Sequence, residues 1–332
     1  DSGGTSEYSV LRLPQTQVKN DLSPLKQAAW IDRYLITVGG SVPIVRTELS
    51  RTERREHRQV RYSNKQRMIY SIPPGLYGIG HPSKQSPVFV SANYKLSFDE
   101  LRRHLRGVNG WILVLDTRGI NVWCAAGKGT FGTDELVRRI ELTQLQKQVS
   151  HRRIIVPQLG APGISAHRVK GESGFHVDYG PVQASSIPSY IKAGFKKSNE
   201  MHRIRFPWRD RLVLTPMEMS QIFKYTPYFL VALLLLNLFS GTALPGNLLL
   251  ESGLLVLTIL VGAVLTPLLL PFIPFRAFSA KGWGLGAAIV LLPLLLIESE
   301  NVLKLAYLLL FPPLAAYLAL NFTGSSTYTS LS

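Results

Sequence analysis

One octapeptide carries the side chains best suited to chemistry, and it holds the only cysteine among 332 residues. It reads Asn121-Val122-Trp123-Cys124-Ala125-Ala126-Gly127-Lys128. Asn121 is a typical N-cap residue, and a helix starting there would place Cys124 in its first turn. The unpaired N–H groups of that turn, together with Lys128 one turn later, favour a thiolate. The sulfur is therefore a candidate nucleophile or soft metal ligand.

The small residues of the octapeptide allow two interpretations. Ala125, Ala126 and Gly127 predict an almost bare helix face, which would let a large flat group approach closely. The same residues would also suit close packing around a buried structural cysteine, which is the commoner role of a lone cysteine. The local pattern leaves both possibilities open.

Two predicted elements position Cys124 in the chain. The preceding run, Trp111 to Asp116, is short, apolar and rich in branched residues, so it predicts a strand buried on both faces. The following run, Thr133 to Gln148, carries apolar residues at helical spacing and acidic residues in its opening turn. We therefore expect Cys124 near the carboxyl end of a strand, where open α/β sheets bind their ligands.

The surrounding residues, 72 to 218, alternate between strand and helix patterns, which indicates an α/β domain with a parallel sheet. Pro73-Pro74-Gly75 predicts a turn, and Ser97 is the expected N-cap of the first helix. The loop at Gly160 and Gly163 follows a predicted strand, so it should line the same crevice as Cys124. The expected strands are 87–92, 111–116, 153–156, 176–182 and 203–206, and the expected helices are 98–106, 133–148 and 189–197.

The octapeptide resembles the signature of the mercury-methylating corrinoid protein, the HgcA family. The resemblance runs from about Ile72 to the last residue of the chain. Further matching stretches also resemble a relative, the corrinoid iron–sulfur protein of acetyl-CoA synthesis. They are residues 88–99, which include Asn93, residues 113–120, residues 127–133, which include Gly129 and Thr130, and residues 321–330.

The resemblance implies a Rossmann-like corrinoid-binding domain in which Cys124 is the lower axial ligand of cobalt. The helix that carries Cys124 would cap the macrocycle, and Trp123 would pack that helix against the sheet. A thiolate suits a soft metal centre and pushes charge through it, which eases release of a methyl group to an electrophile. Further candidate corrinoid-binding residues are Asn121, Val122, Ala125, Ala126, Gly127, Lys128, Gly129, Thr130, Asn93, Gly160 and Gly163.

The implied activity is that of a corrinoid-dependent methyltransferase, which passes a methyl group from methylcobalt(III) corrinoid to inorganic Hg(II) and forms methylmercury. The resemblance also implies a methyl donor that depends on methylated folate. A 4Fe–4S cluster takes four cysteine thiolates, and this chain has one cysteine. Electrons for cobalt must therefore come from a partner, which the resemblance implies is an HgcB-like ferredoxin.

Two other functions remain open. One is a corrinoid methyl carrier of one-carbon metabolism in the acetyl-CoA pathway, whose acceptor is not mercury. The other is a membrane-bound nucleotide-binding redox module that uses the G-x-G-x-x-G pattern at Gly127 to Gly132. That pattern starts about ten residues beyond the strand, and no acidic residue stands about 20 positions further on, which argues against the second function.

The basic N-terminal segment, residues 1–71, is of uncertain structure, with a strand or short helix expected within residues 28–45. Residues 46–67 are dense in arginine and form either a solvated surface or one attracted to anionic lipid headgroups. Nucleic-acid binding is not expected, because aromatic residues do not interleave with the charges. The corrinoid-binding domain is expected to cover residues 72–224.

The last part of the chain, residues 225–332, has a membrane-like composition. It holds three basic and three acidic residues, so the net charge of +16 belongs to the residues before it. Apolar stretches at 225–240, 248–271, 283–297 and 302–321 predict an all-α transmembrane domain with four spans. The resemblance implies a fifth span beyond them, so we expect the sequence to be a fragment. Arg276 and Lys281 predict a multi-pass protein of the cytoplasmic (inner) membrane, with the α/β domain facing the cytoplasm.

Overall fold

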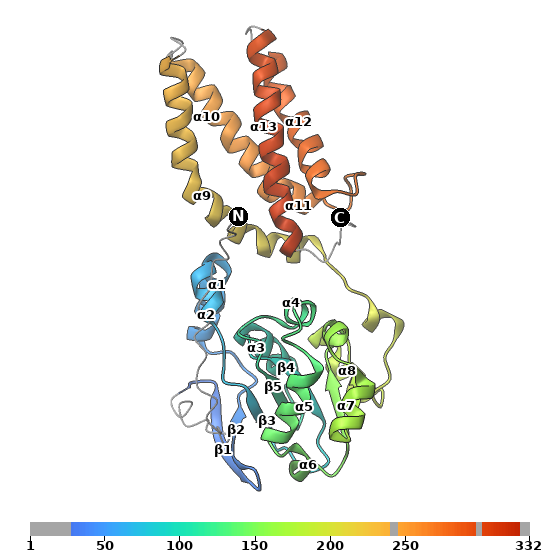
Figure 1. Cartoon of the computed structure of the whole chain (residues 1–332). Coiled ribbons are helices and arrows are strands. Elements are labelled where there is room, and N and C mark those ends of the chain that lie inside the picture. The colour runs from blue at the N-terminus through green and yellow to red at the C-terminus, as the bar shows by residue number, and fades with distance from the viewer. Residues whose placement is uncertain (1–27, 240–244, 297–300, 326–332) are drawn as a thin grey trace, which may run out of the picture. The chain divides into compact units, whose positions relative to one another are not determined.

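The computed structural model describes residues 28–239, 245–296 and 301–325 (Figure 1). These residues fall into two compact units, and each unit is made of two segments of the chain. The first unit contains residues 28–50 and 71–197, and the second contains residues 51–70 and those from 198 onward. The arginine-dense stretch at 51–70 therefore leaves the first unit, joins the second, and the chain then returns.

A seven-stranded sheet forms the centre of the first unit, with the order β1-β2-β3-β5-β4-β6-β7 among the described residues. The neighbours β5, β4, β6 and β7 are all parallel, whereas β3 is antiparallel to β5. An antiparallel hairpin of β1 and β2 extends the sheet beyond β3. The α/β class is confirmed, but the sheet is mixed. The strands are Ile31–Thr37 (β1), Gly40–Val45 (β2), Gly75–Ile79 (β3), Val88–Ala92 (β4), Gly110–Leu115 (β5), Arg153–Val156 (β6) and His176–Tyr179 (β7).

The sequence pattern identified three of these strands closely and missed β3. Every residue of β4 and β5 is buried, as expected for strands covered on both faces. The Pro-Pro-Gly segment at residues 73–75 leads directly into β3 and does not form a separate turn. Two glycines dilute the apolar pattern of β3, and packing requires one of them, because a Cβ at Gly78 would collide with the side chain of Ile44. The strand expected at 203–206 has no regular secondary structure.

The helices of the first unit differ from the prediction at their ends. The first of them begins at Lys95 with Tyr94 as its N-cap, not at residue 98 after Ser97. The long helix expected over 133–148 is split by Gln144, whose φ of 49° is left-handed. The helices are Lys95–His104 (α3), Val122–Gly127 (α4), Thr133–Leu142 (α5), Leu145–Gln148 (α6), Ala166–Ser173 (α7) and Ile187–Lys192 (α8), with 3-10 turns at Gln158–Gly163 (η2) and Ala184–Ser186 (η3).

A buried ionic cluster explains the early start of α3. The Lys95 ammonium contacts both carboxylate oxygens of Asp99 at 2.6 Å, and Arg102 Nε donates to Asp99 Oδ1 at 2.7 Å. Arg102 also donates to the carbonyl of Arg46. Because Lys95 and Asp99 stand four residues apart on one helical face, the pair forms only if the helix already includes Lys95. All three charged side chains are buried, so they depend on one another.

The second unit is helical. Three of its described stretches are long and apolar enough to cross a membrane, and they coincide with three expected spans: Leu248–Leu269, Phe278–Leu296 and Asn301–Asn321. The first expected span falls within a longer helix whose apolar part, Ile222–Leu235, is shorter. The acidic residues 298 and 300 and the stretch 326–330 lie outside the described residues. The helices are Arg51–Tyr62 (α1), Asn64–Ile69 (α2), Trp208–Phe239 (α9), Pro245–Leu260 (α10), Thr266–Leu269 (α11), Phe278–Leu296 (α12) and Asn301–Asn321 (α13), with a π-helical turn at Val261–Leu265 and 3-10 turns at Asn199–His202 and Phe322–Ser325.

Small residues and one buried carboxylate hold the apolar helices together. A Cβ at Gly282 in α12 would lie 2.6 Å from the Cβ of Ala319, so α12 and α13 approach each other closely. The carboxylate of Glu251 in α10 accepts from Asn237 Nδ2 at 2.6 Å and from the Tyr307 hydroxyl at 3.0 Å. This network ties α9, α10 and α13 by polar contacts inside an otherwise apolar bundle.

Replacing Asp99 by alanine should destabilise the first unit strongly. The variant leaves the Lys95 and Arg102 charges buried without their carboxylate, which costs about 3–5 kcal/mol. Glu100→Ala is the matched control, because its exposed carboxylate contributes at most about 1 kcal/mol. Thermal unfolding of the full chain in detergent measures both changes. Equal shifts for the two variants would contradict the role assigned to Asp99.

Candidate functional site

The site lies where the connections of the parallel strands change direction. In the sheet, β4 has β5 on one side and β6 on the other. The chain runs from β4 to β5 and then crosses back over β4 to reach β6, so the direction of the connections reverses between β4 and β6. Ligands of open α/β sheets bind at the carboxyl ends of the strands at such a switch point. After β5 the chain forms α4, which contacts β4 and also η2, the turn that follows β6. The Gly160 loop therefore lies beside the Cys124 segment, and its part in a shared ligand crevice stays a prediction.

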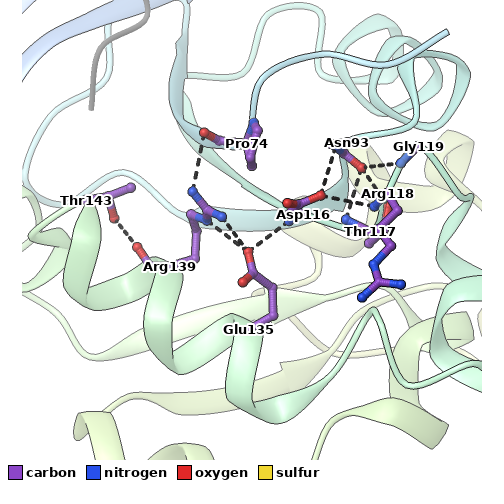
Figure 2. A network of polar contacts seen from close by, with 9 residues as sticks. All are labelled: Pro74, Asn93, Asp116, Thr117, Arg118, Gly119, Glu135, Arg139 and Thr143. Atoms are coloured by element: carbon purple, nitrogen blue, oxygen red, sulfur yellow. Dashed lines mark hydrogen bonds and ion pairs between the residues drawn. The ribbon is translucent and has the colours of Figure 1, made fainter. Parts of the chain in front are cut away.

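Asn93 shapes the loop that leads to α4 (Figure 2). Its buried Oδ1 accepts hydrogen bonds from the Thr117 N–H at 3.0 Å, the Thr117 hydroxyl at 2.8 Å and the Gly119 N–H at 3.0 Å. Its Nδ2 donates to Asp116 Oδ1 at 3.3 Å. Arg118 and Gly119 both have left-handed φ values, of 57° and 71°, so the loop turns sharply around this amide. In this arrangement the Asn93 side chain positions the loop.

A second set of contacts fixes the start of the same loop (Figure 2). The Asp116 N–H donates to Glu135 Oε1 at 2.9 Å. Arg139 holds that carboxylate through Nε at 3.0 Å and Nη2 at 2.6 Å, and its Nη1 donates to the Pro74 carbonyl at 3.5 Å. The end of β5, the first turn of α5 and the entry to β3 are thus joined. Sequence analysis missed this set, although the four-residue spacing of Glu135 and Arg139 was a usable signal.

Helix α4 has the N-cap that the sequence predicted. Asn121 Oδ1 accepts the Cys124 N–H at 2.9 Å, and Cys124 itself is partly exposed. The expected bare face is only partly right, because Ala125 and Ala126 are 0% and 5% exposed and belong to the hydrophobic core. Their small size lets α4 pack closely onto the core. The open surface consists of the residues just after them.

That open surface is formed by Gly127, Lys128 and Gly129, which are all exposed. A Cβ placed on either glycine would meet nothing within 4 Å. On the other side of α4, Val122 packs against the core, whereas Trp123 is partly exposed. Cys124 therefore stands between a packed face and an open one.

Close packing accounts for the two glycines of η2. A Cβ at Gly163 would collide with the Phe131 carbonyl oxygen and lie 3.2 Å from the Ala126 Cα. A Cβ at Gly160 would collide with the buried ring of Phe131. Thr130, which is partly exposed, donates from Oγ1 to the Ala125 carbonyl at 3.5 Å. Direct contact of Gly160, Gly163 and Thr130 with a corrinoid stays a prediction.

A lysine distant in sequence supports the start of η2. Lys197 Nζ donates to Gln158 Oε1 at 2.7 Å. Burial lowers the pKa of Lys197, and the nearby Asp178 carboxylate opposes that effect. The two partners are 39 residues apart, so no local pattern could have indicated their contact.

The donor set of the site suits a soft metal centre. Cys124 offers one sulfur, which is partly exposed beside an uncovered, glycine-lined surface. Elsewhere in the described residues, no three His, Cys, Asp or Glu side chains come together as a metal-binding group. The residues therefore fit a metal that brings most of its own ligands and takes one thiolate from the protein.

Comparisons with known proteins relate part of this chain to proteins of the acetyl-CoA pathway. Residues 56–191 match the family model CdhD, described as CO dehydrogenase/acetyl-CoA synthase delta subunit. The acetyl-CoA decarbonylase/synthase complex subunit gamma of Archaeoglobus fulgidus is 31% identical over 123 residues, which cover 36% of this chain and 26% of that subunit. The corrinoid/iron–sulfur protein large subunit of Moorella thermoacetica is 28% identical over 196 residues, which cover 56% and 41% of the two chains.

The likeness has a clear extent. The gamma subunit of Methanopyrus kandleri is 30% identical over 123 residues, with the same shares of both chains as the first relative. This chain thus spans about a quarter of the length of the two gamma subunits. The expected relation to the corrinoid protein of the acetyl-CoA pathway is confirmed.

Replacing Gly163 by alanine should push η2 away from α4. The added methyl group meets the Phe131 carbonyl, and such overpacking costs about 1–3 kcal/mol. Gly171→Ala is the control, because its methyl group meets nothing within 4 Å and helix α7 should gain up to about 1 kcal/mol. Thermal unfolding and the rate of Cys124 alkylation measure the effects. An unchanged alkylation rate in Gly163→Ala would show that η2 does not hold α4.

Replacing Asn93 by alanine should loosen the loop before α4. The Thr117 and Gly119 N–H groups lose their acceptor, at a cost of about 1–3 kcal/mol for the buried Thr117 donor. Asn109→Ala is a matched control at the opposite end of β5, where the Asn109 side chain accepts one bond from the exposed His81 N–H. Hydrogen exchange of residues 116–124 should accelerate in the first variant only. Equal protection in both variants would remove the positioning role.

Proposed function

We propose that this chain is a membrane-associated corrinoid methyl carrier in which Cys124 would hold the cobalt of the bound corrinoid. The observation that carries the proposal is the partly exposed thiol on a capped helix at the carboxyl edge of the sheet. The related proteins support it, because one of them is a corrinoid/iron–sulfur protein. When bound, the corrinoid would supply a cobalt centre that can carry a methyl group.

The residues of the chain have separate tasks in this proposal. Cys124 offers its partly exposed sulfur as the one ligand from the protein. Asn93 and Asn121 fix the loop and the first turn, so the sulfur is held in one place. Gly127 and Gly129 leave the adjoining surface uncovered, where a macrocycle would lie. Lys128 adds a positive charge on that exposed side, which suits the phosphate of a corrinoid nucleotide tail.

For the acceptor we propose inorganic Hg(II), with methylmercury as product. A bound corrinoid would supply a cobalt-carried methyl group that can pass to an electrophile such as Hg(II). Cys124 would hold that metal through its sulfur, a strong electron donor, which would favour this transfer. The resemblance of residues 121–128 to the mercury-methylating signature supports this choice of acceptor.

A second candidate is a methyl carrier of the acetyl-CoA pathway whose acceptor is not mercury. The comparisons favour it, since the family match is to an acetyl-CoA synthase subunit and the relatives carry names from the same pathway. Cys124 would have the same task in both candidates. Only the acceptor distinguishes them.

The proposed partners follow from what the chain lacks and what it contains. It has one cysteine, so a ferredoxin-type 4Fe–4S protein would supply electrons and a folate-dependent protein the methyl group. The three long apolar helices support attachment to a membrane. We place the chain in the cytoplasmic membrane with its α/β unit on the cytoplasmic side, as the basic residues favour.

Cys124→Ala should abolish the thiolate ligand and slow methyl transfer. The full chain is loaded with a methylated corrinoid, and its visible absorption is followed after addition of Hg(II). We expect the variant to show a changed spectrum and a rate roughly 100-fold lower, equivalent to about 2.7 kcal/mol. Ser185→Ala, an exposed position outside the site, should behave as wild type.

The outcomes separate the candidates. A wild-type spectrum in Cys124→Ala would remove the ligand role and both corrinoid candidates that rely on it. Normal corrinoid binding, with no transfer to Hg(II) above the protein-free methylcorrinoid, would leave the acetyl-CoA pathway carrier. Faster transfer by wild type than by either the variant or the protein-free corrinoid supports Hg(II) as acceptor.

A further inference from the structure

The loop before α4 holds an arginine in a backbone conformation that arginine rarely adopts. Residues Thr117 to Ile120 form a tight turn, closed by a hydrogen bond from the Ile120 N–H to the Thr117 carbonyl at 3.1 Å. Its two central residues, Arg118 and Gly119, both have left-handed φ values, of 57° and 71°. That pattern defines a type I′ turn, whose first central position favours asparagine, aspartate or glycine. Arginine is strained there, because its Cβ crowds the backbone.

Two side chains hold the turn in this shape (Figure 2). Asp116 Oδ1 accepts the Arg118 N–H at 3.0 Å, and Asn93 Oδ1 accepts the Gly119 N–H at 3.0 Å. The two acceptors also bind each other, since Asn93 Nδ2 donates to Asp116 Oδ1 at 3.3 Å. The neighbouring residues therefore stabilise a conformation that the Arg118 side chain disfavours. Strain that is held in this way at the edge of a site indicates a functional reason for the strained residue.

The Arg118 guanidinium is exposed and has no hydrogen bond or ion pair with any residue that the structure describes. Arg118 enters the network only through its backbone N–H, and Figure 2 shows its side chain extending away from Asn93. The Asp116 carboxylate accepts from the Arg118 N–H and the Asn93 amide and does not pair with the guanidinium. The guanidinium thus presents a fork of N–H donors that matches the oxygen atoms of a phosphate.

Arg118 stands at the same edge of the sheet as Cys124. It follows the last residue of β5 by three positions and precedes the first residue of α4 by four. The acidic residues that begin α5 are both paired with arginines, so they do not neutralise this edge. Lys128, just after α4, is exposed as well, and its ammonium forms no ion pair within the described ranges. The edge that carries the thiol therefore offers two cations to an anionic group.

We propose that Arg118 binds the phosphate of a corrinoid nucleotide tail and so selects corrinoids that carry one. The inference rests on the proposed function, because it assigns a group of the same ligand to a residue beside the same thiol. Lys128 supplies a point charge, whereas the guanidinium fork can pair two phosphate oxygens at once. Arginine at this position gives the fold nothing that asparagine would not give better, so its benefit arises when the ligand is bound.

The test titrates the full chain in detergent with cobinamide, which has no phosphate, and with cobinamide phosphate. Quenching of tryptophan fluorescence measures affinity, and thermal unfolding without ligand measures stability. We expect wild type to bind cobinamide phosphate more tightly than cobinamide. Arg118→Asn should weaken binding of cobinamide phosphate roughly tenfold and leave cobinamide unchanged. The same variant should unfold at a higher temperature, because asparagine suits a type I′ turn.

Arg138→Gln is the matched control, since it removes another exposed arginine of the same unit and should behave as wild type in both measurements. Equal weakening of both ligands by Arg118→Asn would overturn the proposal, and so would unchanged binding of cobinamide phosphate. If wild type binds neither corrinoid, the proposed function itself fails. If it binds both equally well, only the phosphate contact fails. Should Arg118→Asn not fold, the preference of wild type between the two ligands decides alone.

Discussion

The loop that leads to Cys124 takes its shape mainly from the side-chain amide of Asn93. Asn93 stands at the end of one central strand and accepts three hydrogen bonds from the loop that leaves the next. Two consecutive residues of that loop are left-handed, so it needs outside contacts to keep its shape. Because α4 follows within a few residues, the direction of the thiol is set by strands β4 and β5. The hydrogen bonds of Asn93 therefore hold this loop against the buried strands β4 and β5.

Small residues also position α4. Ala125 and Ala126 bring α4 down onto the core, and Gly160 and Gly163 allow η2 to press against it from the other side. The glycines after the helix stay uncovered, so close packing and open surface lie within one short segment. This contrast is what we propose a large, flat cofactor with a single protein ligand would need. The proteins similar to this chain include a corrinoid/iron–sulfur protein large subunit.

Short-range sequence patterns predicted the features that depend only on neighbouring residues. The branched runs of β4, β5 and β6 and the N-cap at Asn121 follow from short-range rules, and the structure confirms them. The face of α4 could not be assigned, since a six-residue helix has too few turns to show a periodicity. The sequence did not indicate the break at Gln144, because glycine and asparagine are the residues typical of a left-handed φ and neither stands at that position. Contacts such as Asn93 with Thr117, 24 residues apart, belong to tertiary structure and leave no pattern in the sequence.

The insertion of residues 51–70 into the second unit has a consequence for how the chain is made. Helix α1 leaves the ribosome about 150 residues before α9, its packing partner, a wait of roughly 10–30 s at usual elongation rates. During that time the strongly basic α1 has α2 beside it but still lacks its contacts with α9. A single proteolytic cut between residues 197 and 198 would keep all seven strands in one fragment, but that fragment would also carry residues 51–70, which belong to the second unit. The second unit therefore cannot be completed until α9 has been synthesised, because α1 comes from within the first unit's part of the sequence.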